Sequence, residues 1–304
     1  MNDLNIPLVS VAIITYNQKQ FLKECIESVL FQDYQNIEII IADDGSTDGT
    51  QDMLKDYSNQ YPNLFTLKLS NINCGITNNS NIAHFACKGK YISWMGGDDL
   101  MLPYKLSKQV AFMESHQKCS ICYHNLEVFD SSTGKPLYFF NTSRNSKQGN
   151  IKTLIKFGTI NGACSTMVRT DQTPILGFDQ LLPVASDWLF WIETLANGGE
   201  IHYLNEVLGK YRRHASNVTK KQITNSISQN ELDHLLTCSI LLSRYPEYNK
   251  QVFKRMSVIL RSYRFLKKDK YESFLSASLN CHFNWKSLAL LILHFASFKI
   301  LKNL

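Results

Sequence analysis

The feature that most constrains the fold is a series of short apolar runs separated by segments with helical spacing. The runs are rich in β-branched residues and continuous, as expected of strands covered on both faces. This alternation predicts an α/β domain with a mostly parallel sheet. The predicted strands are Val9–Thr15, Ile37–Ala42, Leu64–Leu69 and Tyr91–Met95, and the predicted helices between them are 18–31, Thr47–Tyr57 and Ile76–Ala86.

The second half of the chain has a less regular pattern. We predict a helix over 104–116, a strand over 119–129, a turn-rich loop over 130–150 and an aromatic-rich helix over Asp187–Asn197. Glycines at 198 and 199 are typical of the end of such a helix. From about residue 225 onward the pattern is helical and basic. We therefore expect one domain over 1–220, with halves 1–105 and 106–220, and a helical region over 221–304.

The net charge of +6 is unevenly distributed. From Arg244 to Leu304 there are 12 Lys and Arg against 3 Asp and Glu, whereas the first 243 residues carry 20 against 23. A nucleic-acid-binding protein would combine basic charge with a recognisable binding motif, and none is found. The slightly acidic first part therefore argues against nucleic acid as a partner.

Targeting signals and cysteines indicate a cytoplasmic protein. Residues 1–10 lack the basic start and apolar stretch of a secretory signal. The longest apolar runs, such as Leu288–Leu293, are shorter than the ~20 residues that span a bilayer. Eight cysteines then read as reduced thiols. Cys119 and Cys122 form a C-x-x-C without a second pair, which favours a buried strand over a metal site.

Two acidic pairs, Asp43–Asp44 and Asp98–Asp99, follow predicted strands directly. In a parallel sheet such positions face one crevice. Clustered carboxylates need a positive partner, and Mg²⁺ or Mn²⁺ with a substrate diphosphate meets that need. Turn formation and helix capping are the structural alternative, and we expect them at Ser46 and Asp48. Neither G-x-G-x-x-G nor a P-loop is found, which argues against nicotinamide-type and P-loop ATPase sites.

The stretch VSVAIITYNQKQFLKECIESVLFQDYQNIEIIIADDGSTDGT resembles the nucleotide-binding half of family 2 glycosyltransferases, which have the GT-A fold. NINCGITNNSNIA, GKYISWMGGDDLMLP, SDWLFWIETLANGG and YRRHASNVT match the same family in order and spacing, so the resemblance covers about residues 7–219. The resemblance implies inverting transfer of a sugar from a nucleotide-diphosphate donor, a UDP-sugar, to a saccharide acceptor. It also implies a role in surface polysaccharide (O-antigen) assembly and a requirement for Mn²⁺ or Mg²⁺. Residues 1–105 would bind the nucleotide-sugar and 106–220 the acceptor.

The resemblance also implies roles for individual residues. Tyr16 would stack on the base and Asp44 would accept its imide N–H. Gly96-Gly97-Asp98-Asp99 stands where many members have D-x-D-D, so Asp98 would contact the ribose or the metal and Asp99 the metal. Gly96 replaces the first Asp, and Asn79-Ser80-Asn81 stands where Ala-Arg-Asn is common, so a cationic contact is missing. The remaining donor-site residues implied are Thr15, Asn17, Asp43 and Asn81.

On the acceptor side, the resemblance implies that Asp187 in Ser186-Asp187-Trp188 is the general base. The structural alternative is an acidic residue in a first helical turn, which the helix dipole favours. In Tyr211-Arg212-Arg213-His214, Arg212 would bind the diphosphate and His214 the metal, or the segment is a basic surface loop. Trp188 and Trp191, at helical spacing, are expected in the core rather than against a sugar. The Q-x-x-R-W motif of processive members is not found, which favours single additions.

Residues 245–304 interleave Lys and Arg with apolar side chains. Basic amphipathic helices bind anionic membranes, and the resemblance implies a polyprenyl-diphosphate-linked acceptor at the cytoplasmic face of the membrane. Peripheral membrane binding, packing on the domain and homodimer formation are the three interpretations of this region. Two rival functions remain: a nucleotidyltransferase that makes nucleotide-sugars, whose Gly-rich basic loop is not found, and a catalytically weak nucleotide-sugar-binding protein.

Overall fold

The computed structural model describes residues 6–215, 217, 227–264 and 268–302. The chain divides into two compact units. The sheet unit comprises residues 1–154 and 159–218, and the helical unit comprises 155–158 and 219–304. The expected boundary at residue 220 therefore lies two residues beyond the end of the sheet unit.

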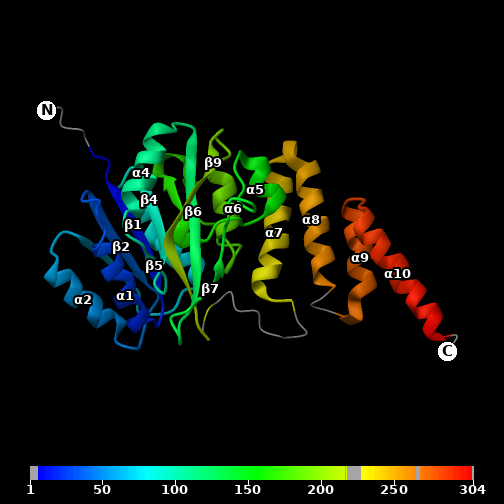
Figure 1. Ribbon diagram of the computed structural model, residues 1–304, viewed down its shortest axis with the longest axis horizontal. Helices are drawn as coiled ribbons and strands as arrows, with labels where there is room; N and C mark the ends of the chain where they lie inside the picture. Colours follow the sequence, from blue (N-terminus) through cyan, green and yellow to red (C-terminus); the bar gives the residue numbers. More distant parts are fainter. Residues whose placement is uncertain (1–5, 216, 218–226, 265–267, 303–304) are drawn as a thin grey trace. The chain divides into compact units, whose positions relative to one another are not determined.

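The sheet unit contains a nine-stranded mixed sheet of order β3-β2-β1-β4-β8-β6-β9-β5, with β7 paired to β6 outside this path (Figure 1). Strands β1 to β4 pair in parallel with one another, as β6 does with β9. Strand β8 is antiparallel to β4 and β6, and β5 and β7 pair antiparallel with β9 and β6. The strands are β1 Val9–Thr15, β2 Ile37–Asp43, β3 Phe65–Leu69, β4 Tyr91–Gly96, β5 Leu100–Met101, β6 Cys119–Asp130, β7 Pro136–Phe139, β8 Met167–Arg169 and β9 Glu200–Arg213.

Helices follow the strands of the first half in the predicted alternation. The α-helices are α1 Lys19–Leu30, α2 Thr50–Gln60, α3 Ile76–Ala86, α4 Lys105–Ser115, α5 Ile151–Phe157, α6 Asp187–Thr194, α7 Gln229–Arg244, α8 Asn249–Tyr263, α9 Tyr271–Cys281 and α10 Trp285–Lys302. The four predicted strands of the first half are confirmed to within one residue at each end. The prediction of a loop over 130–150 is wrong at Pro136–Phe139, which pairs with β6 as β7.

The core explains why these elements form. Every residue of β1 except Ile14 is buried. Helices α1 and α4 cover one face of the strand and α3 covers the other, so neither face meets water. Cys119 and Cys122 are fully buried members of β6, which confirms the buried-strand interpretation of the C-x-x-C. Trp188 and Trp191 are at most 1% exposed, as predicted for core residues.

The helical unit contains α7 to α10. A capping box starts α7, in which Ser228 and Glu231 satisfy each other's backbone N–H groups. A buried hydroxyl network joins three helices, because the Ser278 hydroxyl lies 3.0 Å from that of Ser257 and 2.8 Å from that of Ser287. Among the described residues, no helix combines the length and apolarity needed to span a membrane.

Register places the sequence motifs at one edge of the sheet. Thr15 is the partner of Asp43, and Ile14 is the partner of Gly96, so β1, β2 and β4 end side by side. The acidic pairs therefore lie at the ends of β2 and β4, the two strands that flank β1, at the same edge of the sheet, as their positions in the sequence predicted.

Candidate active site

Two hydrogen bonds join the turn after β1 to the loop after β2. Asn17 has a φ of 50°, and its amide oxygen accepts a hydrogen bond from the Thr47 N–H at 2.8 Å. Its own N–H donates to the Ser46 hydroxyl at 2.7 Å. Thr15 is buried, whereas the Tyr16 side chain is 45% exposed. The turn thus presents one aromatic ring to solvent on a backbone held at two points.

The two carboxylates of the first acidic pair have different surroundings. Asp43 is fully buried and accepts hydrogen bonds from the Ser46 N–H at 2.9 Å, the Gln51 amide at 2.7 Å and the Ser46 hydroxyl. These contacts shape the turn that contains Gly45, whose φ is +76°. A Cβ at Gly45 would lie 2.6 Å from the Ile72 carbonyl carbon, so both the conformation and the space require glycine.

Asp44 connects the end of β2 to the start of α3. Its Oδ1 accepts from the Cys74 N–H at 2.7 Å and lies 2.9 Å from the Cys74 Sγ, and its Oδ2 accepts from the Gly75 N–H at 3.0 Å. Burial, and then the neighbouring Asp44 carboxylate, raise the pKa of the Cys74 thiol above its usual value. The thiol therefore keeps its proton and serves as a donor to Asp44.

In the second acidic pair, Asp98 faces His214. The Asp98 Oδ2 lies 2.9 Å from the His214 Nε2 and accepts from the Asn217 amide at 3.1 Å. The two side chains are 17% and 7% exposed, and the His214 ring packs against Phe21 with centroids 4.8 Å apart. The arrangement brings together the carboxylate and the imidazole that the resemblance assigned to the metal.

Asp99 points into the protein. It is 4% exposed, and its Oδ1 accepts from the Arg212 N–H at 3.0 Å. Burial, followed by the nearby Asp98 charge, raises the pKa of the Asp99 carboxyl well above its ordinary value. Gly96 leaves room for both carboxylates, because a Cβ there would lie 2.7 Å from the Asp98 Oδ1 and 3.4 Å from the Asp99 Oδ2.

Arg212 is a buried member of β9 rather than part of a surface loop. Its Nε donates to the Asp98 backbone carbonyl at 2.7 Å, and its Nη2 lies 2.5 Å from the Glu24 carboxylate. The guanidinium carbon lies 4.8 Å from the ring centroids of both Phe21 and Phe129. These contacts hold the turn that carries Asp98 and Asp99.

Asp187 begins α6, as predicted. Its Oδ1 accepts from the Trp188 N–H at 2.8 Å, and the side chain is partly buried. Burial raises the pKa of this carboxyl from 3.8 to about 6, although the backbone hydrogen bonds act in the opposite direction. A carboxyl with a pKa near neutral is suited to accept a proton during catalysis.

Helix α3 holds the loop that leads to Asp187. The Thr77 hydroxyl donates to the Leu182 carbonyl at 2.6 Å and lies 2.9 Å from the Ser186 hydroxyl. The Asn81 amide donates to the Phe178 carbonyl at 2.8 Å and accepts from its N–H at 2.7 Å. Asn81, which we had expected in the donor site, thus binds this loop through both ends of its amide.

Sequence reasoning missed four of these residues: Glu24, Cys74, Thr77 and Ser186. Nothing in the sequence singles out Glu24 or Thr77, because their partners lie more than 100 positions away along the chain. All four stand inside stretches quoted for the resemblance, and Ser186 directly precedes Asp187, which is the only further signal that could have found one of them.

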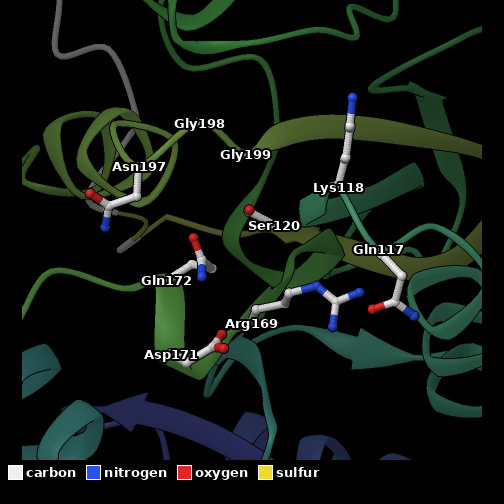
Figure 2. A pocket seen from close by; sticks show the side chains of 9 residues that line it. All are labelled: Gln117, Lys118, Ser120, Arg169, Asp171, Gln172, Asn197, Gly198 and Gly199. Atoms are coloured by element: carbon white, nitrogen blue, oxygen red, sulfur yellow. The ribbon is translucent and has the colours of Figure 1, made fainter.

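A polar pocket of about 300 Å³ lies elsewhere in the sheet unit, at the start of β6 and β9 (Figure 2). Arg169 lines it but donates to the carbonyls of Cys119 and Met113 and to the Tyr91 hydroxyl. In Figure 2 the Lys118 side chain extends away from the Arg169 guanidinium, so the two cations do not converge. We assign no ligand to this pocket.

Residues 10–171 match the family model described as Glycosyl transferase family 2. WfaP of Escherichia coli, a UDP-Glc:alpha-D-GlcNAc-diphosphoundecaprenol beta-1,3-glucosyltransferase, is 30% identical over 226 residues, which are 74% of this chain and 85% of WfaP. An uncharacterised protein of Mycobacterium tuberculosis is 31% identical over 215 residues, which are 69% of this chain. The chain spans 60% of the length of that mycobacterial relative.

Solved structures of several glycosyltransferases have a similar fold. TarS 1–349 of S. aureus in complex with UDP-GlcNAc has a TM-score of 0.68 and 17% identity, covering 97% of this chain and 88% of that one. The mannosyltransferase PcManGT of Pyrobaculum calidifontis in complex with GDP-Man and Mn2+ has a TM-score of 0.63 and 15% identity, covering 95% and 80%.

Proposed function

Because this chain belongs to glycosyltransferase family 2 and has the GT-A fold, we propose that it transfers a sugar from a UDP-sugar to a saccharide acceptor, with inversion at the anomeric carbon. One observation carries the proposal. Gly75, the residue before α3, binds Asp44 through its N–H, and Thr77 in the first turn of α3 binds the loop before Asp187. A donor-side carboxylate and a candidate base are therefore attached to one short helix.

The donor would lie over the turn after β1. The exposed Tyr16 ring is available to stack on the base, and Asp44 keeps carboxylate lone pairs beyond those used by Cys74 and Gly75. Asp43 supports this site from inside, because its oxygens accept hydrogen bonds from Ser46 of the turn and from Gln51 of α2. The UDP-Glc in the name of WfaP and the UDP-GlcNAc bound to TarS support a uridine nucleotide.

The residues fit a divalent cation held jointly by protein and donor. Among the described residues, no three acidic, histidine or cysteine side chains converge as a ready metal cluster. Asp98 and His214 supply one carboxylate and one imidazole at 2.9 Å, and Mg²⁺ or Mn²⁺ bound to nucleotides takes its other ligands from phosphate and water. We assign the metal to Asp98 and His214, and we assign Asp99 and Arg212 to holding their turn. When bound, the ion would stabilise charge on the leaving diphosphate.

The proposed reaction is a direct displacement. The acceptor hydroxyl oxygen forms a bond to the anomeric carbon while the bond from that carbon to the diphosphate oxygen breaks. The hydroxyl proton passes to the Asp187 carboxylate, and the nucleoside diphosphate leaves. Asp187 is suited to this step because it is ionised above its pKa of about 6 and is held at the start of α6.

The acceptor we propose is lipid-linked and belongs to surface polysaccharide assembly, because the acceptor in the name of WfaP is a diphosphoundecaprenol-linked sugar. The helical unit would then meet the cytoplasmic membrane surface peripherally. Its α10 exposes Trp285 by 74% and Leu293 by 65%, within a segment rich in Lys and Arg. Flotation with anionic liposomes, compared with Trp285→Ala, tests this. Size-exclusion chromatography distinguishes a homodimer formed by the same surface.

The deciding experiment compares Asp187→Asn with wild type and with the exposed control Asp171→Asn. Release of UDP from UDP-sugars in the presence of Mn²⁺ and α-D-GlcNAc-diphosphoundecaprenol measures turnover, and thermal shift measures donor binding. We expect Asp187→Asn to bind donor normally and lose transfer, and Asp171→Asn to retain both. Near wild-type turnover in Asp187→Asn would refute the assignment. Binding of UDP-sugar by wild type without turnover would instead indicate a nucleotide-sugar-binding protein.

A further inference from the structure

Strand β7 exposes an aromatic surface that the packing of the sheet unit does not require. All four of its residues are exposed, and Leu137, Tyr138 and Phe139 are 52%, 50% and 51% exposed. Successive side chains of a strand point to opposite faces, so Tyr138 is presented on one face of the sheet and Phe139 on the other.

Sheet register brings Tyr138 next to the end of β9. Tyr138 is the partner of Val128 in β6, and Val128 is the partner of Tyr211 in β9. The Arg213 Nη2 donates to the Tyr138 hydroxyl at 3.5 Å, and its guanidinium carbon lies 4.8 Å from the Tyr211 ring centroid. Tyr138, Arg213 and Tyr211 thus form one cluster, which we call the β7 cluster.

The β7 cluster adjoins the candidate active site. Arg213 is followed directly by His214, whose Nε2 lies 2.9 Å from Asp98, and consecutive Cα atoms are about 3.8 Å apart. Figure 1 places β7 at the same end of the sheet as β5, the strand that follows Asp99. A ligand on this cluster would therefore lie one residue along the chain from His214, the proposed metal ligand.

The chemistry of the cluster suits a sugar diphosphate. The exposed Tyr138 ring offers a flat apolar face with a hydroxyl at one end, which matches the face and rim of a pyranose ring. The arginine fork matches phosphate oxygens. The carboxylate nearest to Arg213 in the register is that of Asp130, its partner in β6, and the Asp130 Oδ1 accepts hydrogen bonds from the Ser132 and Thr133 N–H groups of the following turn. Glu127 is held by Lys210 at 2.8 Å on the opposite face.

We propose that the β7 cluster is the acceptor subsite, in which Tyr138 stacks on the acceptor sugar and Arg213 binds the acceptor diphosphate. The choice of ligand rests on the proposed function. The binding test below does not depend on transfer, so failure of the subsite and failure of the proposed function give different results.

The test is the affinity for α-D-GlcNAc methyl diphosphate, measured by ligand-observed NMR with UDP and Mg²⁺ saturating the donor site. We expect wild type to bind, and Tyr138→Ala and Arg213→Gln to raise the Kd about tenfold or more. Tyr138→Phe retains the ring and should bind nearly as well as wild type. Phe139→Ala is the matched control, equal in exposure and on the opposite face, and should change the Kd by less than about twofold.

Three results would overturn the proposal. The first is no binding by wild type, and the second is an equal loss in Phe139→Ala and Tyr138→Ala. The third is a dimer that Tyr138→Ala dissociates in size-exclusion chromatography, because the open edge of β7 would then be an interface between copies. Methyl diphosphate and free GlcNAc, measured alone, should each bind more weakly than the sugar diphosphate; equal binding by methyl diphosphate would refute the stacking role of Tyr138.

Discussion

Replacing Asp187 with asparagine should make the protein more stable at neutral pH while abolishing transfer. The pKa of Asp187 is about 6 in the folded chain, against 3.8 for an unperturbed carboxyl. Because burial raises the folded pKa, ionisation of this group opposes folding. The cost is absent below about pH 3.8, develops between pH 3.8 and pH 6, and is complete above pH 6.

The free-energy cost of ionising Asp187 in the folded chain follows from the size of its pKa shift. At 1.36 kcal/mol for each pKa unit, the cost is at most about 3 kcal/mol above pH 6. At pH 4.5 only about 1 kcal/mol of it remains. Asparagine keeps an acceptor oxygen for the Trp188 N–H, which donates to Asp187 at 2.8 Å, so the substitution removes the charge without removing this contact.

The measurement is urea-induced unfolding of wild type and Asp187→Asn at pH 4.5 and pH 7.5. We expect the variant to gain up to about 3 kcal/mol in free energy of unfolding at pH 7.5, with a gap about 2 kcal/mol smaller at pH 4.5. Asp171→Asn, at an exposed position, should show no such dependence. If the difference in free energy of unfolding between the two proteins is zero at both pH values, or increases as the pH falls, burial does not destabilise the ionised Asp187 carboxylate.

Three further predictions concern the same site. The kcat/KM of transfer should fall about tenfold per pH unit below pH 6, because Asp187 must be ionised to accept a proton, and a profile that stays flat to pH 4.5 would exclude it as the base. His214→Ala should raise the Mn²⁺ concentration needed for half-maximal turnover by about tenfold or more, whereas an unchanged requirement would remove His214 from the metal site. Arg212→Met should lower the free energy of unfolding by about 3 kcal/mol, because it leaves Glu24 and the Asp98 carbonyl without their partner; a loss below about 1 kcal/mol would show that these bonds contribute little.

The first half of the fold could be predicted because its strands are continuous apolar runs that belong to a parallel sheet. Ile37–Asp43 shows this, since five of its seven residues are buried. Strands β7 and β9 could not be predicted in this way. The four residues of β7 are all exposed, and β9 mixes buried and exposed residues without strict alternation because its register against β6 shifts at several points. Tertiary pairing, rather than local pattern, determines them.

In the candidate active site, too, some features could be predicted from local sequence and others depend on tertiary contacts. The sequence placed Asp44, Asp98 and Asp187 at strand and helix ends, and the structure has them there. It could not distinguish Asp98 from Asp99, because two adjacent carboxylates have the same chemistry and only the fold turns one toward His214 and the other toward the Arg212 backbone. Likewise, Arg212 has the charge that suits a diphosphate, but its partner Glu24 lies 188 positions earlier in the chain.

The attachment of two sites to α3 has a consequence for how this chain can vary in length. A helix turns by about 100° for each residue. Only one residue, Ile76, separates Gly75, which precedes α3 and binds Asp44, from Thr77, which binds the loop before Asp187. One residue inserted between them would rotate Thr77 away from Ser186 while leaving Gly75 beside Asp44. We therefore expect an insertion or deletion between Gly75 and Thr77 to separate the two attachments.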